Sequence, residues 1–192
     1  MTQYQTGGKL FIFSAPSGSG KTSIVKAILQ KSPFLDFSIS CTTRPPRADE
    51  MDGKDYHFIS VEQFQQLIRD DAFAEWEMVY EGRYYGTLKS EIQRIHYTGK
   101  HVVFDVDVEG GLNLKKLYGL DALAFFIKPP SLAVLEERLR ARNTESEDML
   151  RIRLEKARKE LAYASYFDMV ILNDKLEEAV EEALKHIQAF LS

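Results

Sequence analysis

The sequence predicts an α/β fold in which helices flank a mostly parallel β-sheet. Short apolar runs rich in Val, Ile or Phe alternate with helical patterns, as expected when helices connect parallel strands. A Gly-rich loop joins the first apolar run to the first helical pattern, in the strand–loop–helix order of a phosphate-binding loop (P-loop). One aromatic-rich stretch, residues 40–87, breaks the alternation, and we interpret it as a small inserted α+β lobe.

Five short apolar runs are the candidate strands. Because parallel strands covered by helices have no face toward water, we expect each run to be buried on both faces. Together they would form the mostly parallel sheet at the centre of the fold. The runs are residues 10–15, 37–41, 101–106, 123–127 and 169–172.

Helical periodicity fills most of the intervals between these runs. The first helix carries one apolar stripe, and Ser32-Pro33 ends it because proline cannot continue a helix. The last helix closes the chain with apolar residues at helical spacing. The expected helices are residues 20–31, 61–70, 89–98, 131–141, 147–163 and 175–191.

Composition narrows the classes of protein to which the chain can belong. Its 192 residues suit one domain, and the formal net charge of -4 argues against nucleic acid or anionic lipid as a partner. Cys41 is the only cysteine, which excludes a disulfide within the chain and a thiolate-rich zinc site. No apolar run approaches the ~18 residues that span a bilayer. We expect a cytoplasmic protein, and the sequence leaves its oligomeric state open.

The Gly-rich loop predicts a site for a nucleoside triphosphate, which we take to be ATP once the resemblance given below is included. Glycines let backbone N–H groups curl around an anion at a helix N-terminus, Lys21 supplies a charge for the β- and γ-phosphates, and Thr22 offers a hydroxyl to Mg²⁺. Ala15 stands where the first Gly of the motif is usual, and we expect little harm because Ala is small. The predicted ATP-binding residues are Ala15, Pro16, Ser17, Gly18, Ser19, Gly20, Lys21 and Thr22.

A second phosphate site is suggested by Arg44 and Arg47, three apart on a proline-stiffened loop. Arginine forks match phosphate oxygens, and the hydroxyls of Tyr56 and Tyr85 are candidate donors beside them. From spacing alone, a solvated basic turn explains the arginine pair equally well.

The order of these motifs resembles the guanylate kinase family. The resemblance covers nearly the whole chain, and the Ser-x-Thr-Thr-Arg-x-Pro-Arg run at residues 40–47 is its most specific part after the P-loop. The other matching positions are residues 53–56, Glu75-Trp76, residues 84–87, residues 105–107, Arg138, Arg142, Arg153 and Asn173-Asp174.

The resemblance implies an enzyme that phosphorylates GMP, and also dGMP, with ATP by direct in-line transfer. It implies a nucleoside monophosphate phosphate site at Ser40, Arg44, Arg47, Tyr56 and Tyr85, and guanine contacts at Glu75, Thr87 and Asp107. A carboxylate accepts from guanine N1–H and the exocyclic amine together, whereas adenine presents an acceptor at N1 and would be rejected.

The resemblance also implies a helical lid that brings cationic charge to the transferred phosphoryl group. The lid contributes Arg138, Arg142 and Arg153, and the full set of catalytic residues that the resemblance implies adds Lys21 of the loop and Arg44 of the lobe. Asn173 matches an ATP-side residue. Thr22 and Asp105 are the candidate holders of Mg²⁺. On the same helices we expect Arg140, Arg151 and Arg158 to be solvated ion-pair partners.

The implied organisation is a single guanylate kinase-like domain with two mobile parts. The core comprises residues 1–37, 88–132 and 154–192, the GMP-binding lobe residues 38–87 and the lid residues 133–153. The chain departs from the family at Glu109, where Gln is common, and the effect of this added charge stays open.

Two other functions remain as alternatives. A related kinase of phosphorylated sugars would have no need for Glu75, Thr87 and Asp107, all of which are present. A non-catalytic module that binds phosphorylated partners tends to lose the P-loop lysine and the lid arginines, whereas Lys21 and Arg138 are kept here. Formation of ADP would separate such a module from either kinase.

Overall fold

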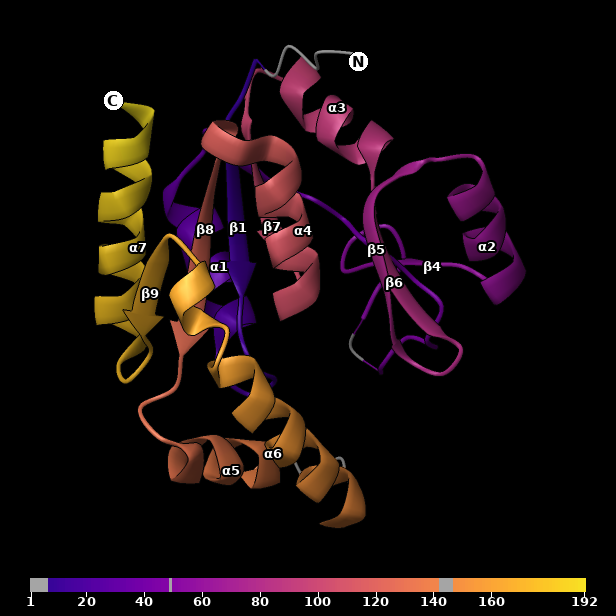
Figure 1. Ribbon diagram of the computed structural model, residues 1–192. Coiled ribbons are helices and arrows are strands. Elements are labelled where there is room, and N and C mark those ends of the chain that lie inside the picture. Colours follow the sequence, from indigo (N-terminus) through magenta and orange to yellow (C-terminus); the bar gives the residue numbers. More distant parts are fainter. Residues whose placement is uncertain (1–6, 49, 142–146) are drawn as a thin grey trace. The chain divides into compact units, whose positions relative to one another are not determined.

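The computed structural model describes residues 7–48, 50–141 and 147–192, and it has the predicted α/β fold (Figure 1). Two compact units can be distinguished, and each is described by itself. The small unit contains Phe34–Val102 with residues 7 and 8, and the core unit contains Lys9–Pro33 and Val103–Ser192.

A five-stranded sheet has the order β2-β7-β1-β8-β9, so strands far apart in the sequence are neighbours. β1 pairs with β8, and β8 with β9, in parallel, which confirms the parallel arrangement expected from helical connections. The strands are β1 (Leu10–Ser14), β2 (Leu35–Phe37), β7 (His101–Asp105), β8 (Ala122–Lys128) and β9 (Met169–Leu172).

Helices cover both faces of β1 in the core unit (Figure 1). Phe11 meets Phe190 of α7 edge-to-face at 6.0 Å between ring centroids. Ser14, whose side chain points the other way because strand side chains alternate, donates a hydrogen bond to the Asp107 carbonyl before α4. The helices are α1 (Lys21–Lys31), α4 (Val108–Tyr118), α5 (Leu132–Ala141), α6 (Glu147–Leu161) and α7 (Leu176–Leu191), and the two 3₁₀ turns are Gly119–Asp121 and Ala164–Tyr166.

Helix α4 was not predicted from the sequence, because adjacent glycines at 110 and 111 weaken a helical pattern. The structure gives Gly111 a packing role. A Cβ at this position would lie 2.1 Å from Ser14 Oγ, so only glycine lets α4 approach β1 this closely. Close packing against the sheet outweighs the low helix propensity of glycine here.

Two expectations about the strands were wrong. The run 37–41 is not one strand: β2 ends at Phe37, and β3 (Cys41–Thr42) belongs to a second sheet. Strand β9 is not buried on both faces, because it lies at the sheet edge and exposes 44% of Val170 and 51% of Leu172. Val170 and Leu172 are two residues apart and so point to the same face, which is left partly open at this edge, whereas Ile171 on the other face is buried.

The small unit is built on a four-stranded sheet of order β4-β3-β6-β5. Phe64 of α2 is fully buried and stacks on Phe73 and Tyr84 of this sheet. Ser60 and Gln63 form a capping box that fixes where α2 begins. Its remaining strands are β4 (His57–Phe58), β5 (Phe73–Tyr80) and β6 (Arg83–Leu88), and its helices are α2 (Val61–Arg69) and α3 (Lys89–Tyr97).

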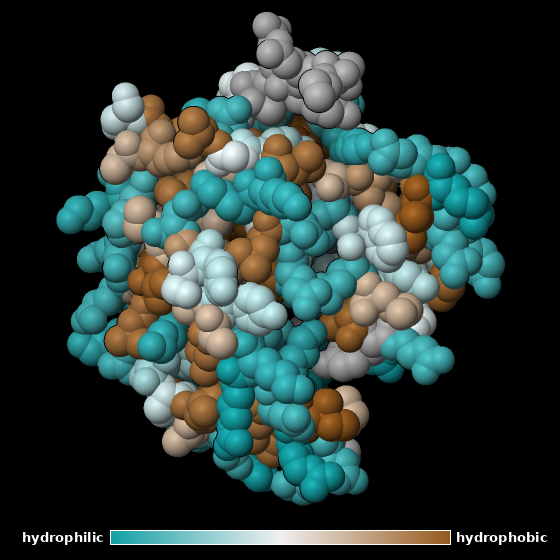
Figure 2. Space-filling model, in the orientation of Figure 1, coloured by the Kyte–Doolittle hydropathy of each residue, from teal (hydrophilic) through white to brown (hydrophobic). Residues whose placement is uncertain are grey.

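Apolar side chains at the surface are interspersed among hydrophilic ones on the face drawn in Figure 2. Over the whole described surface, the most exposed large apolar residues include Leu120 at 92% and Tyr97 at 90%. Scattered exposed apolar residues of this kind are normal for a folded chain. Within the described ranges, none of the helices is long and apolar enough to cross a membrane.

Candidate active site

The phosphate-binding loop joins β1 to α1 in the core unit. Gly18 and Gly20 have φ angles of +93° and +86°, which side chains on L-residues rarely adopt. Gly20 is the N-cap of α1. The backbone N–H groups of the loop therefore lie at the N-terminus of the helix, where its partial positive charge also favours an anion. A Cβ on Gly18 would also lie 2.9 Å from a methyl carbon of Leu139, because α5 packs directly over the loop.

Lys21 and Thr22 lie at the first turn of α1 and face the end of β7. The Lys21 ammonium pairs with Asp105 Oδ1 and donates to the Val106 carbonyl at 2.9 Å. The Thr22 hydroxyl donates to the other oxygen of Asp105 at 2.8 Å. Burial lowers the pKa of Lys21 to about 8, and the carboxylates of Asp107 and Glu160 oppose this shift, so the amine stays cationic at neutral pH.

The same carboxylate and hydroxyl are suitable ligands for Mg²⁺, which prefers oxygen donors. No cluster of three or more His, Cys, Asp or Glu side chains able to hold a metal occurs in the part of the chain that the structure describes. One carboxylate and one hydroxyl fit an ion that arrives bound to nucleotide phosphates and keeps several waters. Thr22 and Asp105 therefore suit Mg²⁺ carried by ATP.

Helices α5 and α6 carry two of the predicted lid arginines, one of which contacts the loop and the other the Asn173 carbonyl. Arg153 donates from Nη1 to Ser17 Oγ at 3.0 Å. Arg138 donates from Nη2 to the Asn173 carbonyl at 3.1 Å, and its buried Nη1 has no hydrogen-bond partner among the described residues. Arg142, the third predicted lid arginine, lies outside the described residues.

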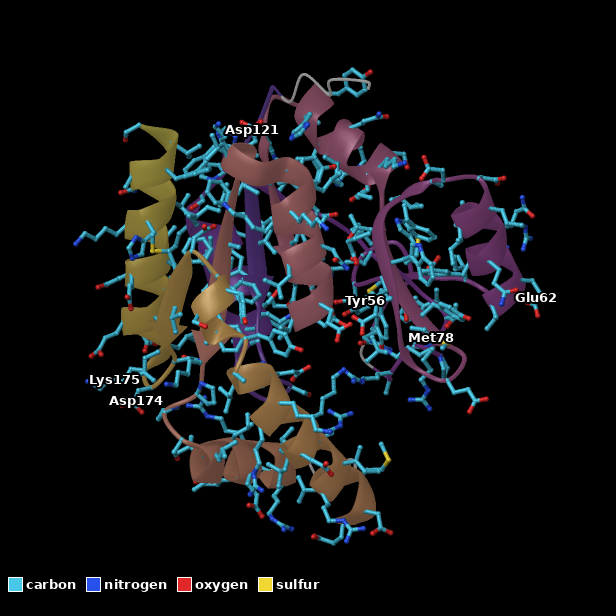
Figure 3. All side chains as sticks on the ribbon, in the orientation of Figure 1. Tyr56, Glu62, Met78, Asp121, Asp174 and Lys175 are labelled. Carbon is cyan, nitrogen blue, oxygen red and sulfur yellow. The ribbon has the colours of Figure 1, made fainter. Side chains whose placement is uncertain are left out.

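Asn173 fastens the loop to the end of β9. Its side-chain amide donates to the Ser19 carbonyl at 2.7 Å, and its backbone N–H donates to the Lys128 carbonyl at 2.8 Å. Asp174 and Lys175 follow on the turn before α7 (Figure 3). Asn173 is 5% exposed, so its first structural task is to hold the loop rather than to present a polar surface.

The contact between Asn173 and Gly20 gives a testable prediction. A Cβ on Gly20 would lie 2.2 Å from Asn173 Nδ2, in addition to the strain of a positive φ. We expect Gly20→Ala to lower the free energy of unfolding by more than the ~1–2 kcal/mol of left-handed strain alone. Gly99→Ala is the control, because its φ of +73° is similar and no atom lies within 4 Å. Equal losses in urea unfolding would contradict the proposed clash.

Glu160 of α6 was not predicted as a site residue, but its charge reaches the loop lysine. Its side chain is 13% exposed and pairs with Lys156 at 3.7 Å. Burial raises the pKa of Glu160 to about 7; Lys156 and Lys21 oppose the shift, and Asp107 adds to it. The Glu160 carboxyl therefore titrates near neutral pH.

Because the pKa of Glu160 is raised in the folded chain, ionised Glu160 lowers the free energy of unfolding. An unfolded chain loses this proton near pH 4.5 and the folded chain near pH 7, so the contribution of Glu160 falls between these values as pH rises. We expect Glu160→Gln to stabilise the protein at pH 8 by on the order of 1–3 kcal/mol relative to its effect at pH 4.5. Urea unfolding at both pH values measures this, with exposed Glu155→Gln as control. If Glu160→Gln changed the free energy of unfolding equally at both pH values, the raised pKa of Glu160 would be refuted.

The small unit brings together three of the predicted monophosphate-site side chains, Arg44, Tyr56 and Tyr85. Arg44 is 8% exposed; its Nε donates to the Tyr85 hydroxyl at 3.1 Å, and its guanidinium lies 4.9 Å from the Tyr56 ring centroid. Tyr56 lies among the crowded side chains beside β5 and β6 (Figure 3). Burial raises the pKa of Tyr56, so its hydroxyl keeps its proton. Arg47 extends outward and is 60% exposed.

The predicted base-reading residues of the small unit also meet. The Thr87 hydroxyl donates to Glu75 Oε1 at 2.7 Å, and Ser40 Oγ lies 3.4 Å from Thr87 Oγ1. Thr87 is 0% exposed and Glu75 and Ser40 are each 8% exposed, so these polar groups are held inside the unit. Glu75 of β5 and Thr87 of β6 lie directly opposite one another in the paired strands, and Ser40 comes from the residue before β3.

Asp107 belongs to the core unit and has a structural task there. Its Oδ1 accepts the Gly110 N–H at 2.8 Å and so caps α4. One carboxylate oxygen is therefore committed to the helix. The neighbouring Glu109, where the family often has Gln, is exposed in the first turn of α4, where a negative charge suits the helix dipole.

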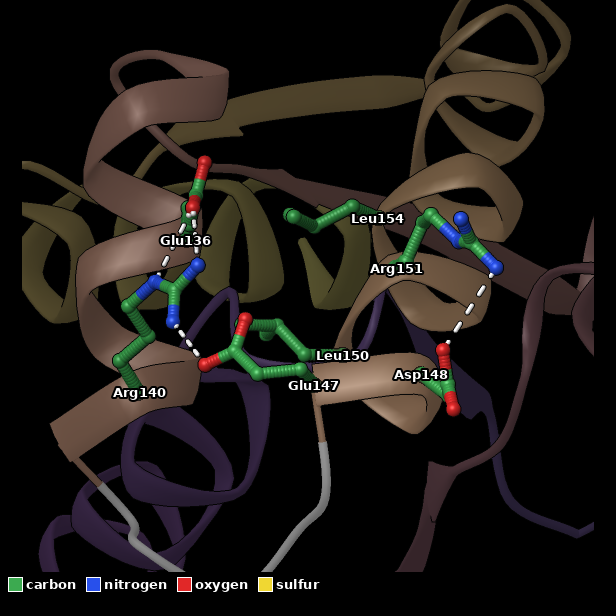
Figure 4. A pocket seen from close by; sticks show the side chains of 7 residues that line it. All are labelled: Glu136, Arg140, Glu147, Asp148, Leu150, Arg151 and Leu154. Atoms are coloured by element: carbon green, nitrogen blue, oxygen red, sulfur yellow. Dashed lines mark hydrogen bonds and ion pairs between the residues drawn. The ribbon is translucent and has the colours of Figure 1, made fainter.

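A surface hollow lies between α5 and α6 and contains none of the predicted site residues (Figure 4). Arg140 bridges Glu136 at 2.9 Å and Glu147 at 2.5 Å, and Arg151 lies 3.6 Å from Asp148. Arg140 and Arg151 are thus solvated ion-pair partners, as the sequence indicates. The hollow is lined by Glu136, Arg140, Glu147, Asp148, Leu150, Arg151 and Leu154.

The fold and the loop define a class of protein before any comparison. A parallel sheet whose first strand leads through a Gly-rich loop into a helix, with a lysine and a hydroxyl at the helix start, is a nucleotide-binding P-loop protein. The small unit has a second set of side chains suited to binding phosphate. A simple nucleotide hydrolase has no need of this second set.

Comparison with known proteins gives the family. The family model described as Guanylate kinase matches residues 7–190. A guanylate kinase of Bacteroides fragilis is 48% identical over 191 residues, covering 99% of this chain and 94% of that protein. One of Chlorobium luteolum is 47% identical over 185 residues, covering 96% and 93%. The crystal structure of guanylate kinase from Anaplasma phagocytophilum has a TM-score of 0.77 at 25% identity, covering 96% of this chain and 87% of that chain. The chain belongs to the guanylate kinase family.

Proposed function

We propose that this chain transfers the γ-phosphoryl group of ATP to GMP, and also to dGMP, giving ADP and GDP or dGDP. Family membership and the intact phosphate-binding loop support the kinase activity. The observation that carries the choice of GMP is the buried Glu75–Thr87 pair, because a polar pair enclosed in this way is suited to reading the edge of a base.

On the core unit, the loop and Lys21 bind and orient the phosphates of ATP. Lys21 is anchored at Asp105 and the Val106 carbonyl, so its charge is held in place before the nucleotide arrives. Mg²⁺ brought with ATP would be held by Thr22 and Asp105, and it would supply charge neutralisation between the phosphates. Arg138 and Arg153 add cationic charge from the helices that cover the loop.

On the small unit, Arg44, Arg47, Tyr56, Tyr85 and Ser40 bind the phosphate of GMP, and Glu75 and Thr87 read guanine. Glu75 accepts from the two N–H donors of the guanine edge, and the Thr87 hydroxyl turns from Glu75 toward O6. Asp107 is proposed to contribute to guanine through the oxygen that does not cap α4. Phosphoryl transfer is direct, because both nucleotides bind at once and no enzyme nucleophile is required.

The test is the formation of ADP from ATP and Mg²⁺ with GMP, dGMP, AMP, UMP or ribose 1,5-bisphosphate as acceptor and water as the blank. We expect rapid turnover with GMP and dGMP alone. Turnover restricted to the sugar phosphate would mean that the base-reading residues have been misassigned. Binding of GMP without any turnover would make the chain a non-catalytic binding module.

Two broader expectations accompany this function. The three-part division into core, GMP-binding lobe and lid is our proposal for the parts that close on the substrates. The buried, unpaired thiol of Cys41 suits the reducing cytoplasm, where we propose that the enzyme acts in purine nucleotide metabolism and GMP recycling.

A further inference from the structure

Glu50, which lies outside the motifs that carry the resemblance, makes a two-pronged pair with Arg44. Glu50 Oε2 lies 2.5 Å from Arg44 Nη1, and Oε1 lies 2.7 Å from Nη2, which makes a two-pronged pair. Both side chains are largely buried, at 8% exposure for Arg44 and 12% for Glu50. Glu50 also accepts the backbone N–H of Arg47 at 2.8 Å, so one carboxylate holds both predicted phosphate-binding arginine positions.

The hydrogen bonds of Arg44 leave little of its guanidinium unused. Nε donates to the Tyr85 hydroxyl, Nη1 donates to Glu50 and the Pro45 carbonyl, and Nη2 donates once to Glu50. These bonds use four of the five N–H donors and leave one on Nη2. The Tyr85 hydroxyl accepts from Arg44, so its own proton remains available to another acceptor.

A phosphate can therefore meet this arginine in one of two ways. It can displace Glu50, or it can bind beside it through the last Nη2 donor and the tyrosine hydroxyls. Displacement would cost the mostly buried Glu50 carboxylate its two-pronged pair with Arg44 and leave it only the contacts with Arg47, which is unfavourable. The Glu50 pair with Arg44 keeps the pKa of the carboxyl below its usual range, so Glu50 is ionised at neutral pH.

We propose that Glu50 is a positioning residue for the acceptor phosphate: it stays paired with Arg44 and fixes the guanidinium so that the free Nη2 donor and the Tyr85 hydroxyl serve the phosphate. The identification of that phosphate as the one on GMP rests on the proposed function. Burial lowers the pKa of Arg44, but the hydrogen bonds that its guanidinium donates to Glu50 and to the Tyr85 oxygen raise it by more, so the pair stays charged throughout the neutral range.

The two ways of binding predict opposite results for Glu50→Gln. If Glu50 positions Arg44, the variant loses the charged pair, and we expect the KM for GMP to rise about 10-fold with little change in kcat. If phosphate displaces Glu50, the variant removes a competitor and the KM falls. A fall, or no change, would overturn the proposal.

Guanosine separates a positioning role from a general structural one, because it has the base but no phosphate. Calorimetric titration of the full chain should show weaker GMP binding for Glu50→Gln and unchanged guanosine binding. Equal weakening for both ligands would overturn the proposal, because the whole unit would then be disturbed. Glu50→Asp keeps the charge and should restore part of the loss, and Glu81→Gln on the exposed β5–β6 turn is the control.

The same titrations distinguish failure of this inference from failure of the proposed function. Wild-type chain that binds GMP but forms no ADP would contradict the kinase function, while the comparison of GMP with guanosine would still decide the role of Glu50. Wild-type chain that turns over GMP, with Glu50→Gln unaffected in KM and binding, would overturn the role of Glu50 alone.

Discussion

Lys21→Ala lowers kcat by about 10²- to 10³-fold or more, the loss expected when one preorganised charge aimed at the transferred group is removed. The reason lies in the surroundings of the ammonium. Asp105 is its direct partner, and the Asp107 and Glu160 carboxylates act on it. Without Lys21 these carboxylates repel the ATP phosphates. Steady-state measurement of ADP formation with GMP and ATP in excess gives the loss.

The fold should survive Lys21→Ala, because burial already opposes the charged amine and the Thr22 hydroxyl still donates to Asp105. Lys26→Ala is the matched control: Lys26 is exposed on the same helix and should leave kcat unchanged. If Lys21→Ala kept most of its turnover while still folded, the loop would not be the site of phosphoryl transfer. Urea unfolding of both variants checks that folding is intact.

Glu75→Gln should weaken GMP far more than ATP. Loss of the carboxylate replaces one acceptor by an amide donor, which faces the N–H groups of guanine. We expect the KM for GMP to rise by about 10- to 100-fold, the cost of a charged hydrogen bond or an unpaired buried donor. The KM for ATP should not change, because Glu75 belongs to the small unit. Kinetics with each nucleotide varied in turn measures both constants.

Discrimination against AMP tests the same assignment more sharply. Gln offers adenine N1 a donor, so Glu75→Gln should narrow the preference for GMP over AMP. Glu81→Gln removes an exposed carboxylate from the turn after β5 and should behave as wild type. An unchanged KM for GMP in Glu75→Gln would mean that another group reads the base.

Much of the fold could be predicted from the sequence because its signals are local. The loop glycines, the apolar runs and the helical stripes each depend on residues close together in the chain. Helix α4 could not be predicted, because Gly111 is chosen for its contact with Ser14, which lies far away in the sequence. The exposed side of β9 likewise follows from its place at the sheet edge, which no local pattern encodes.

Candidate site residues could be predicted where they belong to a sequence motif. Some polar residues that pair with them lie outside these motifs and could not be predicted in the same way. The buried contact of Thr87 with Glu75 depends on pairing between β5 and β6, yet both residues carry a family motif. Glu50 and Glu160 lie outside the P-loop and the motifs that carry the family resemblance. Glu50 follows Arg44 by six residues, and only the fold of the loop between them makes a two-pronged pair.

The most direct test follows the phosphoryl group itself. ATP carrying a radioactive γ-phosphate is incubated with Mg²⁺, GMP and the full chain, and the products are separated. Transfer between two bound nucleotides predicts labelled GDP in equal amount to ADP, and no labelled protein when GMP is omitted. Label found only in inorganic phosphate, or held on the protein, would contradict direct transfer to GMP.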